Sequence, residues 1–364
     1  MPEGSDRIRL VVLFGGQSAE HDVSRISARH VLAAADPERY DIVPIAITKQ
    51  GQWQRAEAAE RALATGPQAL PEALEVDGPQ LDPSPALVAE HPDQRTVVLP
   101  LLHGPMGEDG TVQGLLEVAG VPFVGCGVLS SALAMDKGKA KDVFAALGIP
   151  QARHVTFHEV DVEQVGARTY AKQIADDLGF PAFVKPANLG SSIGISKARD
   201  LDELAAGIEL ALTYDEWIVV EEGVIGREIE CAVLGNLEPR ASLPGEVIPG
   251  ADFYDYEDKY FDGNAVTQIP ADLDPAVTAE LQELAVRAYR ALRCEGMARV
   301  DFFYEHPGRG LLVNEINTIP GFTPISMYPK MWEASGLPYA ELIDELVRLA
   351  LDRFDRRQAK RRTD

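Results

Sequence analysis

The sequence predicts a protein of the mixed α/β and α+β class that contains more than one domain. The chain has 364 residues, beyond the size at which one hydrophobic core usually keeps growing. Its N-terminal part alternates apolar strands with a helical stretch, which is typical of a parallel α/β sheet. Its C-terminal part has two strands around a turn, which predicts an antiparallel hairpin. With 46% hydrophobic and 25% charged residues, the composition is that of a globular protein.

The N-terminal part opens with a strand, a glycine turn and a helix. Residues 8–14 form an apolar strand that runs into Gly15-Gly16, and a helical pattern follows from Ser18 to Ala33. Residues 41–48 and 96–102 are two more short strands. We therefore expect a mainly parallel sheet in this part of the chain.

Residues 54–95 separate the second and third of these strands and show no sustained period. They are rich in Ala, Glu and Pro, and we interpret them as a variable surface insertion with some helix, not as a site. A new domain is expected to begin near residue 128. The later predicted elements are a helix at 135–147 that stops at Gly148, a strand-loop-strand unit at 183–196, strands beyond Ile218, an amphipathic helix at 275–293, a hairpin at 297–317 and a closing helix at 338–354.

The charge balance excludes one class of partner. Asp and Glu outnumber Lys and Arg by 57 to 34, which gives a formal net charge of -23. Such a surface repels a phosphate backbone, so we expect no nucleic acid partner. The one basic cluster is the stretch from Arg353 to Arg362, which we interpret as the solvated end of a helix and not as a binding tail.

The cysteines and two nearby histidines do not form a recognisable metal motif. Cys126, Cys231 and Cys294 are far apart, so we expect reduced, packed thiols in a cytosolic protein. His154 and His158 are separated by strand-forming residues, and we interpret them as packed side chains rather than a metal pair. No apolar run approaches the roughly 20 residues that span a bilayer, and the first residues lack a signal-peptide core. We therefore expect a cytoplasmic location and no membrane partner.

The strongest geometric prediction concerns the hairpin at 297–317. If its strands pair symmetrically about Gly308, paired residue numbers add to a constant. This places Asp301 opposite Glu315 and Arg299 opposite Asn317. All four side chains then share one face, because side chains repeat every second residue along a strand.

Two explanations for this acidic face remain open. Carboxylates directly opposite each other repel, so one or two Mg²⁺ ions would make the arrangement favourable. Oxygen ligands from Asp301, Glu315 and Asn317 suit Mg²⁺, which completes its shell with phosphate oxygens. The alternative is an exposed acidic face that solvent tolerates.

Three further segments combine residue types suited to a ligand site. Lys185 precedes the small-residue loop 187–194, whose backbone N–H groups can approach phosphate, although a plain hairpin connection also explains the loop. His103 opens the segment 103–110 at a strand's carboxyl end, where α/β sheets bind ligands, although a lone histidine is more often structural. Residues 253–260 mix aromatic and charged side chains, which suits either a loop that closes over a site or a surface loop with exposed tyrosines.

Taken together and in this order, the segments resemble the D-alanine–D-alanine ligases of the ATP-grasp superfamily. Four motifs carry the resemblance: Gly15 to Glu20, His103 to Gly110, Met135 to Lys137 and Asn314 to Thr323. The resemblance covers nearly the whole chain except residues 54–95. It implies a three-domain ATP-grasp architecture, with an N-terminal Rossmann-like (preATP-grasp) substrate-binding domain at 1–127, a central ATP-grasp domain at 128–221 and a C-terminal ATP-grasp domain with the metal and substrate site at 222–364.

The resemblance also implies roles for individual residues. The implied ATP ligands are Lys137, Lys185, Ser191, Ser192, Glu221, Glu222, Val224, Glu228 and Lys259. The implied ligands of the two amino acid substrates are Glu20, His103, Lys259, Tyr260 and Ser326. The implied catalytic residues are Glu20, Ser191, Tyr260, Arg299 and Gly321, of which Arg299 and the backbone N–H of Gly321 would face an oxyanion. Two Mg²⁺ ions, for which Mn²⁺ can substitute, would be held by Asp301, Glu315 and Asn317, as in the hairpin argument.

The implied activity is ATP-dependent ligation of two D-alanines, through an acyl phosphate, for cell-wall precursors. The family resemblance also suggests a homodimer through the N-terminal domain. Two alternatives stay open at this point. The second substrate could be D-lactate or D-serine, although the 254–260 loop resembles the dipeptide-forming type. The chain could also be a nucleotide sensor without ligase activity, against which the complete set of lysines, Arg299 and metal ligands argues.

Overall fold

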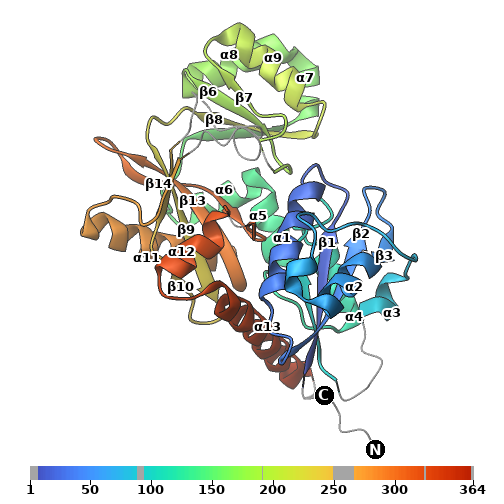
Figure 1. Cartoon of the computed structure of the whole chain (residues 1–364). Helices are drawn as coiled ribbons and strands as arrows, with labels where there is room; N and C mark the ends of the chain where they lie inside the picture. Colours follow the sequence, from blue (N-terminus) through green and yellow to red (C-terminus); the bar gives the residue numbers. More distant parts are fainter. Residues whose placement is uncertain (1–6, 88–93, 191, 249–265, 324, 362–364) are drawn as a thin grey trace, which may run out of the picture.

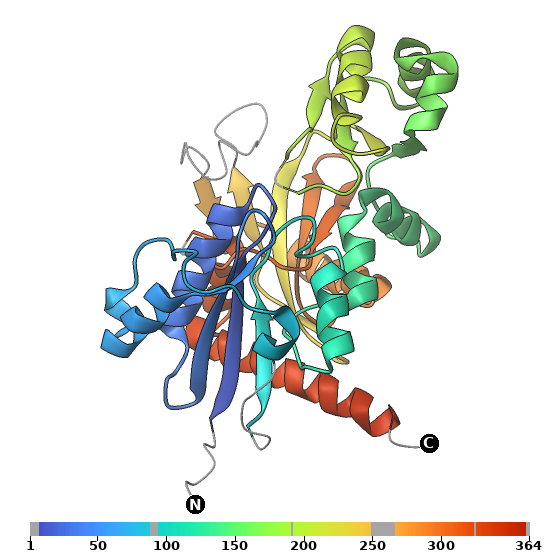
Figure 2. The ribbon, with the colours of Figure 1, turned by 90° about the vertical axis from the view of Figure 1, so that its right-hand side faces the viewer.

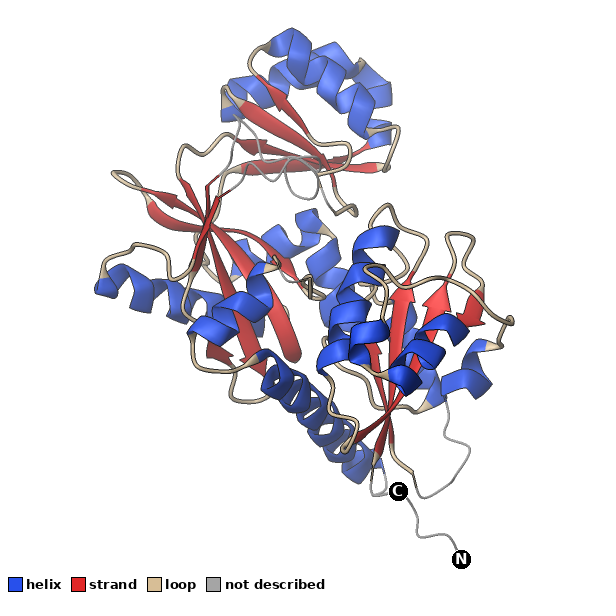
Figure 3. Ribbon diagram, in the orientation of Figure 1, coloured by secondary structure: helices blue, strands red, loops and turns tan. Residues whose placement is uncertain are grey.

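The computed structural model describes residues 7–87, 94–190, 192–248, 266–323 and 325–361. Three separate β-sheets, each covered by helices, organise this part of the chain (Figure 1, Figure 3). Within it, no helix combines the length and the apolar character needed to cross a bilayer.

The N-terminal sheet has the strand order β3-β2-β1-β4. Its strands are β1 (Ile8–Gly15), β2 (Tyr40–Ile47), β3 (Trp53–Arg55) and β4 (Thr96–Pro100), with helices α1 (His21–Ala34) and α4 (Thr111–Ala119). Strand β1 pairs in parallel with both β2 and β4 and is buried from Leu10 to Phe14, which explains its unbroken apolar sequence. The predicted parallel sheet is therefore confirmed, and only the edge strand β3 runs antiparallel.

The stretch 54–95 is more than a surface insertion. It contains α2 (Glu57–Thr65), the 3₁₀-helix η1 (Pro67–Ala69) and α3 (Pro83–Leu87), so the expectation of some helix is confirmed. However, Leu70, Leu74 and Leu87 are buried in the cores around β1. The purely superficial position was a wrong prediction, because these leucines are too irregularly spaced to give a periodic signal.

The central sheet is antiparallel, with the order β5-β8-β6-β7. Its elements are β5 (His154–His158), α7 (Glu159–Val165), α8 (Ala167–Leu178), β6 (Ala182–Pro186), β7 (Ser196–Ala198), α9 (Leu201–Ala211) and β8 (Trp217–Glu222). This unit has its own hydrophobic core and stands at the top of the molecule in Figure 1.

The C-terminal sheet has the order β12-β11-β9-β13-β14, and β10 pairs with β9. Its strands are β9 (Arg227–Gly235), β10 (Arg240–Ala241), β11 (Gly245–Ile248), β12 (Val266–Gln268), β13 (Gly296–Glu305) and β14 (Gly310–Asn317). Helices α5 (Val128–Met135), α6 (Lys137–Ala146) and α11 (Pro275–Ala291) pack into one core with this sheet. The helix predicted at 135–147 is confirmed as α6, which begins two residues later because the side chain of Asp136 caps it. Helix α5, which ends at Met135, was not predicted. The exact domain limits at 127/128 and 221/222 stay a prediction.

The C-terminal helices join the N-terminal and C-terminal sheets. They are α12 (Met327–Ala334) and α13 (Tyr339–Arg361), whose apolar residues share one core with β1 and β9. Figure 2 shows α13 running past the base of the N-terminal sheet. Helix α13 extends about two turns beyond the predicted end at residue 354.

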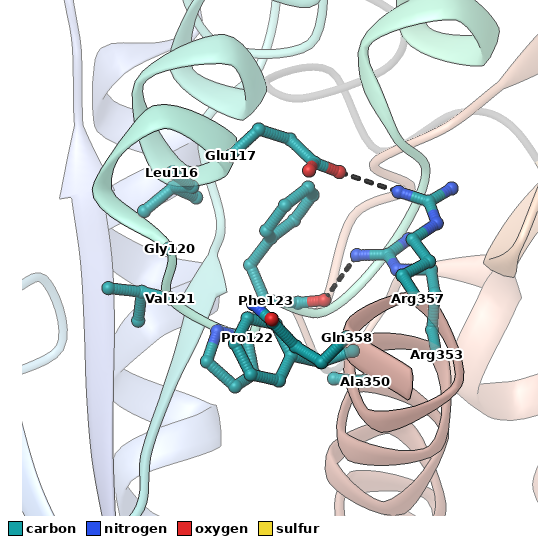
Figure 4. Close-up of a pocket in the computed structure, with 11 residues that line it drawn as sticks. Leu116, Glu117, Gly120, Val121, Pro122, Phe123, Ala350, Arg353, Arg357 and Gln358 are labelled. Atoms are coloured by element: carbon teal, nitrogen blue, oxygen red, sulfur yellow. Dashed lines mark hydrogen bonds and ion pairs between the residues drawn. The ribbon is translucent and has the colours of Figure 1, made fainter. Parts of the chain in front are cut away.

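The basic end of α13 was predicted to be the solvated end of a helix, which is correct for Lys360 but wrong for Arg353. Arg353 is only 3% exposed and donates hydrogen bonds to the backbone carbonyls of Phe123 (2.6 Å) and Gly125. Arg357 pairs with Glu117 (2.6 Å), as Figure 4 shows, and also with Glu295 (2.7 Å). The cavity beside them measures about 20 Å³, room for a single water molecule, so it is a packing gap and not a ligand site. Arg353 and Arg357 therefore hold α13 against the N-terminal part of the chain.

Candidate active site

A cavity of about 440 Å³ lies where the three sheets meet. Its wall takes Glu20, His103 and Glu108 from the N-terminal part, and Lys185 and Glu221 from the central sheet. The C-terminal part contributes the hairpin side chains Arg299, Asp301, Glu315 and Asn317 and the backbone through Gly321. This volume falls in the usual range of small-molecule sites, about 300–1,000 Å³.

The hairpin that forms the floor of the cavity has the predicted register. Asp301 pairs with Glu315, and Arg299 pairs with Asn317. Nearer the turn the register differs by one residue, because a β-bulge follows Asp301 and leaves Asn314 without a cross-strand partner. The turn is therefore centred half a residue before Gly308, and the bulge restores the predicted pairing at the site.

Strand β9 adds a third carboxylate that the sequence reasoning did not identify. Glu230 is the cross-strand partner of Asp301 on the side opposite Glu315. The row Glu230, Asp301, Glu315 thus crosses three adjacent strands, and like charges in such a row repel each other. The alternation of Glu228 and Glu230 along β9 was the available signal.

Arg299 neutralises part of this row. Its guanidinium donates two hydrogen bonds to Asp301, at 2.7 and 2.8 Å, and lies 3.1 Å from Glu230. Burial alone would lower the pKa of Arg299, but Asp301 and Glu230 outweigh it and hold that pKa well above its usual value. Asn317 donates a further hydrogen bond to Asp301 (2.9 Å). The single positive charge of this guanidinium cannot balance the three carboxylates of the row.

The donor set on this floor fits Mg²⁺. Two carboxylates and one amide, all on one face and partly accessible from the cavity, supply the hard oxygen ligands that Mg²⁺ prefers. The remaining positions of an octahedral shell would be left to water or to phosphate oxygens. Asp301, Glu315 and Asn317 therefore remain the candidate metal ligands.

The predicted phosphate lysines both reach the cavity. Lys137 begins α6, and its Nζ donates to the carbonyl of Leu189 (2.5 Å) and lies 3.7 Å from Glu315. Lys185 lies on β6, and its Nζ donates to Glu221 (3.1 Å). Both lysines line the cavity, and Lys137 also contacts its acidic floor through Glu315.

A third lysine, Lys141, was missed by the sequence reasoning. It lies one helical turn after Lys137 and is 1% exposed, and its Nζ is 3.3 Å from Glu221. Burial on its own would raise the pKa of Glu221, but the two neighbouring ammonium groups lower that pKa to about 2. The spacing of four residues between Lys137 and Lys141 was a usable signal, because such residues share a helix face.

The residues that were predicted to bind the nucleotide have different surroundings. The Glu221 side chain contacts lysines, and Glu222 pairs with Arg153 (2.8 Å) and Arg309. Val224 and Glu228 line the cavity, as does Ser192. Ser191, Lys259 and Tyr260, and with them the whole 253–260 loop, lie outside the described residues.

The N-terminal wall brings two carboxylates and a histidine together. His103 Nδ1 donates to the carbonyl of Ile319 (3.0 Å), and its buried Nε2 has no partner among the described residues. Glu20 lies at the start of α1, and a Cβ placed on Gly190 would come within 3.2 Å of its Oε2. Gly190 therefore allows the central loop to approach Glu20.

Two other predicted residues lie next to each other. Gly321 lines the cavity, and Ser326 stands directly behind it, where it accepts a hydrogen bond from the N–H of Thr323 (3.0 Å). Ser326 is not among the described residues that line the cavity. A substrate contact for Ser326 stays a prediction.

Glu108 gives the stability of the protein a specific pH dependence. Burial and the nearby Glu20 raise its pKa to about 8. The folded state then holds a proton that the unfolded chain releases above about pH 4.5. Stability is expected to fall as pH rises from about 4.5 to 8, by at most about 1.4 kcal/mol per pH unit.

We therefore expect Glu108→Gln to have a higher melting temperature than the unmodified protein, by a difference that grows as pH rises from 6 to 8.5. Thermal unfolding of both proteins across this range checks the expectation. Glu163→Gln, at an exposed glutamate on α7, should leave the pH dependence as it is. A melting difference for Glu108→Gln that does not change with pH contradicts the shift.

Neither the cysteines nor His154 and His158 are among the described residues that line this cavity. All three cysteines are free and buried, and burial raises the pKa of the Cys231 thiol to about 12. His158 Nδ1 accepts a hydrogen bond from the N–H of Val160 (3.3 Å), and its Nε2 lies 3.7 Å from Glu216. The structural role expected for the histidine pair stays a prediction.

Comparison with known proteins covers nearly the whole chain. A family model described as D-ala D-ala ligase N-terminus matches residues 9–126, and one described as D-ala D-ala ligase C-terminus matches residues 143–348. The D-alanine--D-alanine ligase of Solibacter usitatus (strain Ellin6076) is 49% identical over 355 residues, which cover 98% of this chain and 99% of that protein. That of Bacillus cytotoxicus is 46% identical over 359 residues, covering 97% and 98%.

Solved structures give the same result. The D-alanine-D-alanine ligase from Coxiella burnetii superposes with a TM-score of 0.80 at 37% identity, covering 98% of this chain and 97% of that one. VanG D-Ala:D-Ser ligase from Enterococcus faecalis superposes with a TM-score of 0.77 at 36% identity, covering 94% and 99%. The predicted ATP-grasp fold is thereby confirmed, and the chain belongs to the D-alanine–D-alanine ligase family.

Proposed function

We propose that this chain joins two D-alanine molecules into D-alanyl-D-alanine at the expense of ATP, for peptidoglycan precursor synthesis in the cytoplasm. One observation carries the proposal. A single cavity combines two lysines suited to phosphate, a row of carboxylates with Arg299, and a separate wall of Glu20 and His103. A nucleotide, a cation and an amino acid each find groups of fitting charge there.

The nucleotide would lie between the central and C-terminal sheets. Lys137 and Lys185 would orient its phosphates, and Glu222, Val224 and Glu228 would surround its adenosine. Bound at Asp301, Glu315 and Asn317, Mg²⁺ would neutralise the charge of the phosphate oxygens. Phosphoryl transfer depends mostly on such positioning and charge neutralisation.

The first D-alanine would be held by its ammonium group at Glu20. His103 Nε2 has no protein partner among the described residues and, in the neutral ring, would take a hydrogen bond from the same group. The carboxylate of this substrate then attacks the γ-phosphoryl group and forms an acyl phosphate and ADP. Ser191 and Tyr260 would connect to Glu20 through hydrogen bonds.

The second D-alanine completes the reaction. Its amine attacks the acyl phosphate carbon, and its carboxylate would be held by Lys259 and Ser326. Arg299 and the N–H of Gly321 would stabilise the tetrahedral oxyanion before phosphate leaves. Closure of the 253–260 loop would keep water from the acyl phosphate in the meantime.

A product assay tests the proposal. Purified protein is given ATP, Mg²⁺ and D-alanine, with D-lactate or D-serine added as the competing second substrate. We expect D-alanyl-D-alanine as the main product at neutral pH, together with one phosphate per dipeptide. The similarity to VanG D-Ala:D-Ser ligase makes D-serine the informative competitor, and a preference for it would replace the assignment of the second substrate.

The same assay separates a ligase from a nucleotide sensor. Phosphate release with D-alanine is expected to exceed release without it many-fold. Equal rates would support a sensor. A homodimer formed through the N-terminal domain is also part of the proposal, and the molecular mass in solution tests it.

A further inference from the structure

A buried triad of charges stands behind the phosphate side of the cavity. It consists of Lys141 on α6, Lys185 on β6 and Glu221 on β8. Glu221 Oε1 lies 3.3 Å from Lys141 Nζ, and Glu221 Oε2 accepts a hydrogen bond from Lys185 Nζ at 3.1 Å. The side chains of Lys141 and Glu221 are 2% and 3% exposed, so solvent screens neither charge.

The two lysines differ in what they can reach. Lys185 and Glu221 line the cavity, whereas Lys141 does not. Besides Glu221, the nearest acceptor of Lys141 Nζ is the carbonyl of Asn314, at 3.5 Å. Lys141 therefore has no direct route to a ligand, while Lys185 can exchange one partner for another.

The charge balance explains why two lysines serve one carboxylate. Two ammonium groups and one carboxylate leave a net charge of +1 in the triad. If Lys185 turns to a phosphate, a carboxylate with no other partner would remain buried and unpaired, which is strongly unfavourable. Lys141 prevents this, because it keeps Glu221 paired whichever partner Lys185 has.

We propose that Lys141 is a positioning residue that holds the Glu221 charge and so frees Lys185 to bind the ATP phosphates. The inference deepens the proposed function, since it rests on Lys185 being a phosphate ligand. Lys141 acts only through Glu221 and Lys185. Its effect should therefore concern the phosphates of the nucleotide and not the adenosine.

Lys141→Met tests this role, because it keeps the length of the side chain and removes the charge. Glu221 then has Lys185 as its sole partner, and the net charge of the triad falls to zero. We expect the Kd of MgATP, measured by calorimetry, to rise about 10- to 100-fold, the range of a lost charge-assisted hydrogen bond. The Kd of adenosine, the KM of D-alanine and kcat at saturating ATP should each stay within about threefold.

A second variant restores the charge balance. In Lys141→Met combined with Glu221→Gln, the triad again has a net charge of +1, and Lys185 is not held by a carboxylate. Because Glu221 lines the cavity and is itself an implied ATP ligand, Glu221→Gln alone is the reference. We expect the double variant to bind MgATP with a Kd within about threefold of that of Glu221→Gln and more tightly than Lys141→Met. In the double variant the Lys185 ammonium has lost its carboxylate partner, but Lys185 lines the cavity, where water or phosphate can reach it. The double variant therefore also decides the matter if Lys141→Met alone does not fold.

Lys139→Met is the matched control. Lys139 lies on the same helix, is exposed, and pairs only with Asp142 among the contacts identified for it, at 3.0 Å. It should leave MgATP binding unchanged. A packing role for Lys141 predicts equal loss of MgATP and adenosine binding and no recovery in the double variant, and either result overturns the inference.

The outcomes also separate this inference from the proposed function. If the unmodified protein neither binds MgATP nor makes the dipeptide, the ligase assignment fails regardless of Lys141. If it does both and Lys141→Met binds MgATP as tightly, only the role of Lys141 fails.

Discussion

Asp301→Asn is expected to lower ATP-dependent dipeptide formation by more than about 100-fold, because loss of even an indirect metal partner typically costs about 10- to 100-fold. Asp301 is the middle member of the row that crosses β9, β13 and β14. The substitution keeps the shape and removes one of the charges that a cation would neutralise. Raised Mg²⁺ should restore part of the activity, and Mn²⁺ binding followed by electron paramagnetic resonance should weaken in parallel.

Glu230→Gln separates this effect from the loss of an arginine partner. Both Glu230 and Asp301 contact Arg299, at 3.1 and 2.7 Å. Only Asp301 is a candidate metal ligand, so raised Mg²⁺ should improve Asp301→Asn and leave Glu230→Gln as it is. Normal Mn²⁺ binding by Asp301→Asn would remove Asp301 from the metal site.

The acidic floor was predictable from sequence because it follows from strand periodicity alone. Once Gly308 is taken as the centre of the turn, the partners of Asp301 and Arg299 follow by counting. The bulge at Asn314 was not predictable, since it depends on how the strand packs and not on a local pattern. Two small errors, in the turn centre and in the missing bulge, cancelled at the site.

Long-range contacts explain what the sequence reasoning missed. Arg353 looked like one of several solvated basic residues, yet it is buried because the backbone of Phe123 and Gly125 covers it. The burial of Lys141 is explained by its ion pair with Glu221, which lies 80 positions away in the chain. Neither partner can be inferred from the spacing of neighbouring residues.

Arg299→Met is expected to reduce kcat about 10²- to 10³-fold, the usual cost of losing one oxyanion donor. Arg299 is the only arginine among the described residues that line the cavity. The KM of ATP should change little, because Lys137 and Lys185 remain. Arg299→Lys, which keeps the charge and loses the two-pronged geometry, should recover only part of kcat.

Metal affinity and turnover should move in opposite directions in Arg299→Met. The guanidinium competes with a cation for Asp301, so its removal should tighten Mn²⁺ binding while kcat falls. Added Mg²⁺ should then fail to restore activity, in contrast to Asp301→Asn. Arg227→Met, which breaks a comparable two-pronged pair with Glu246 on the neighbouring strands, controls for general loss of stability. If Arg299→Met lost activity only through weaker metal binding, Arg299 would organise the acidic floor and would not stabilise the oxyanion.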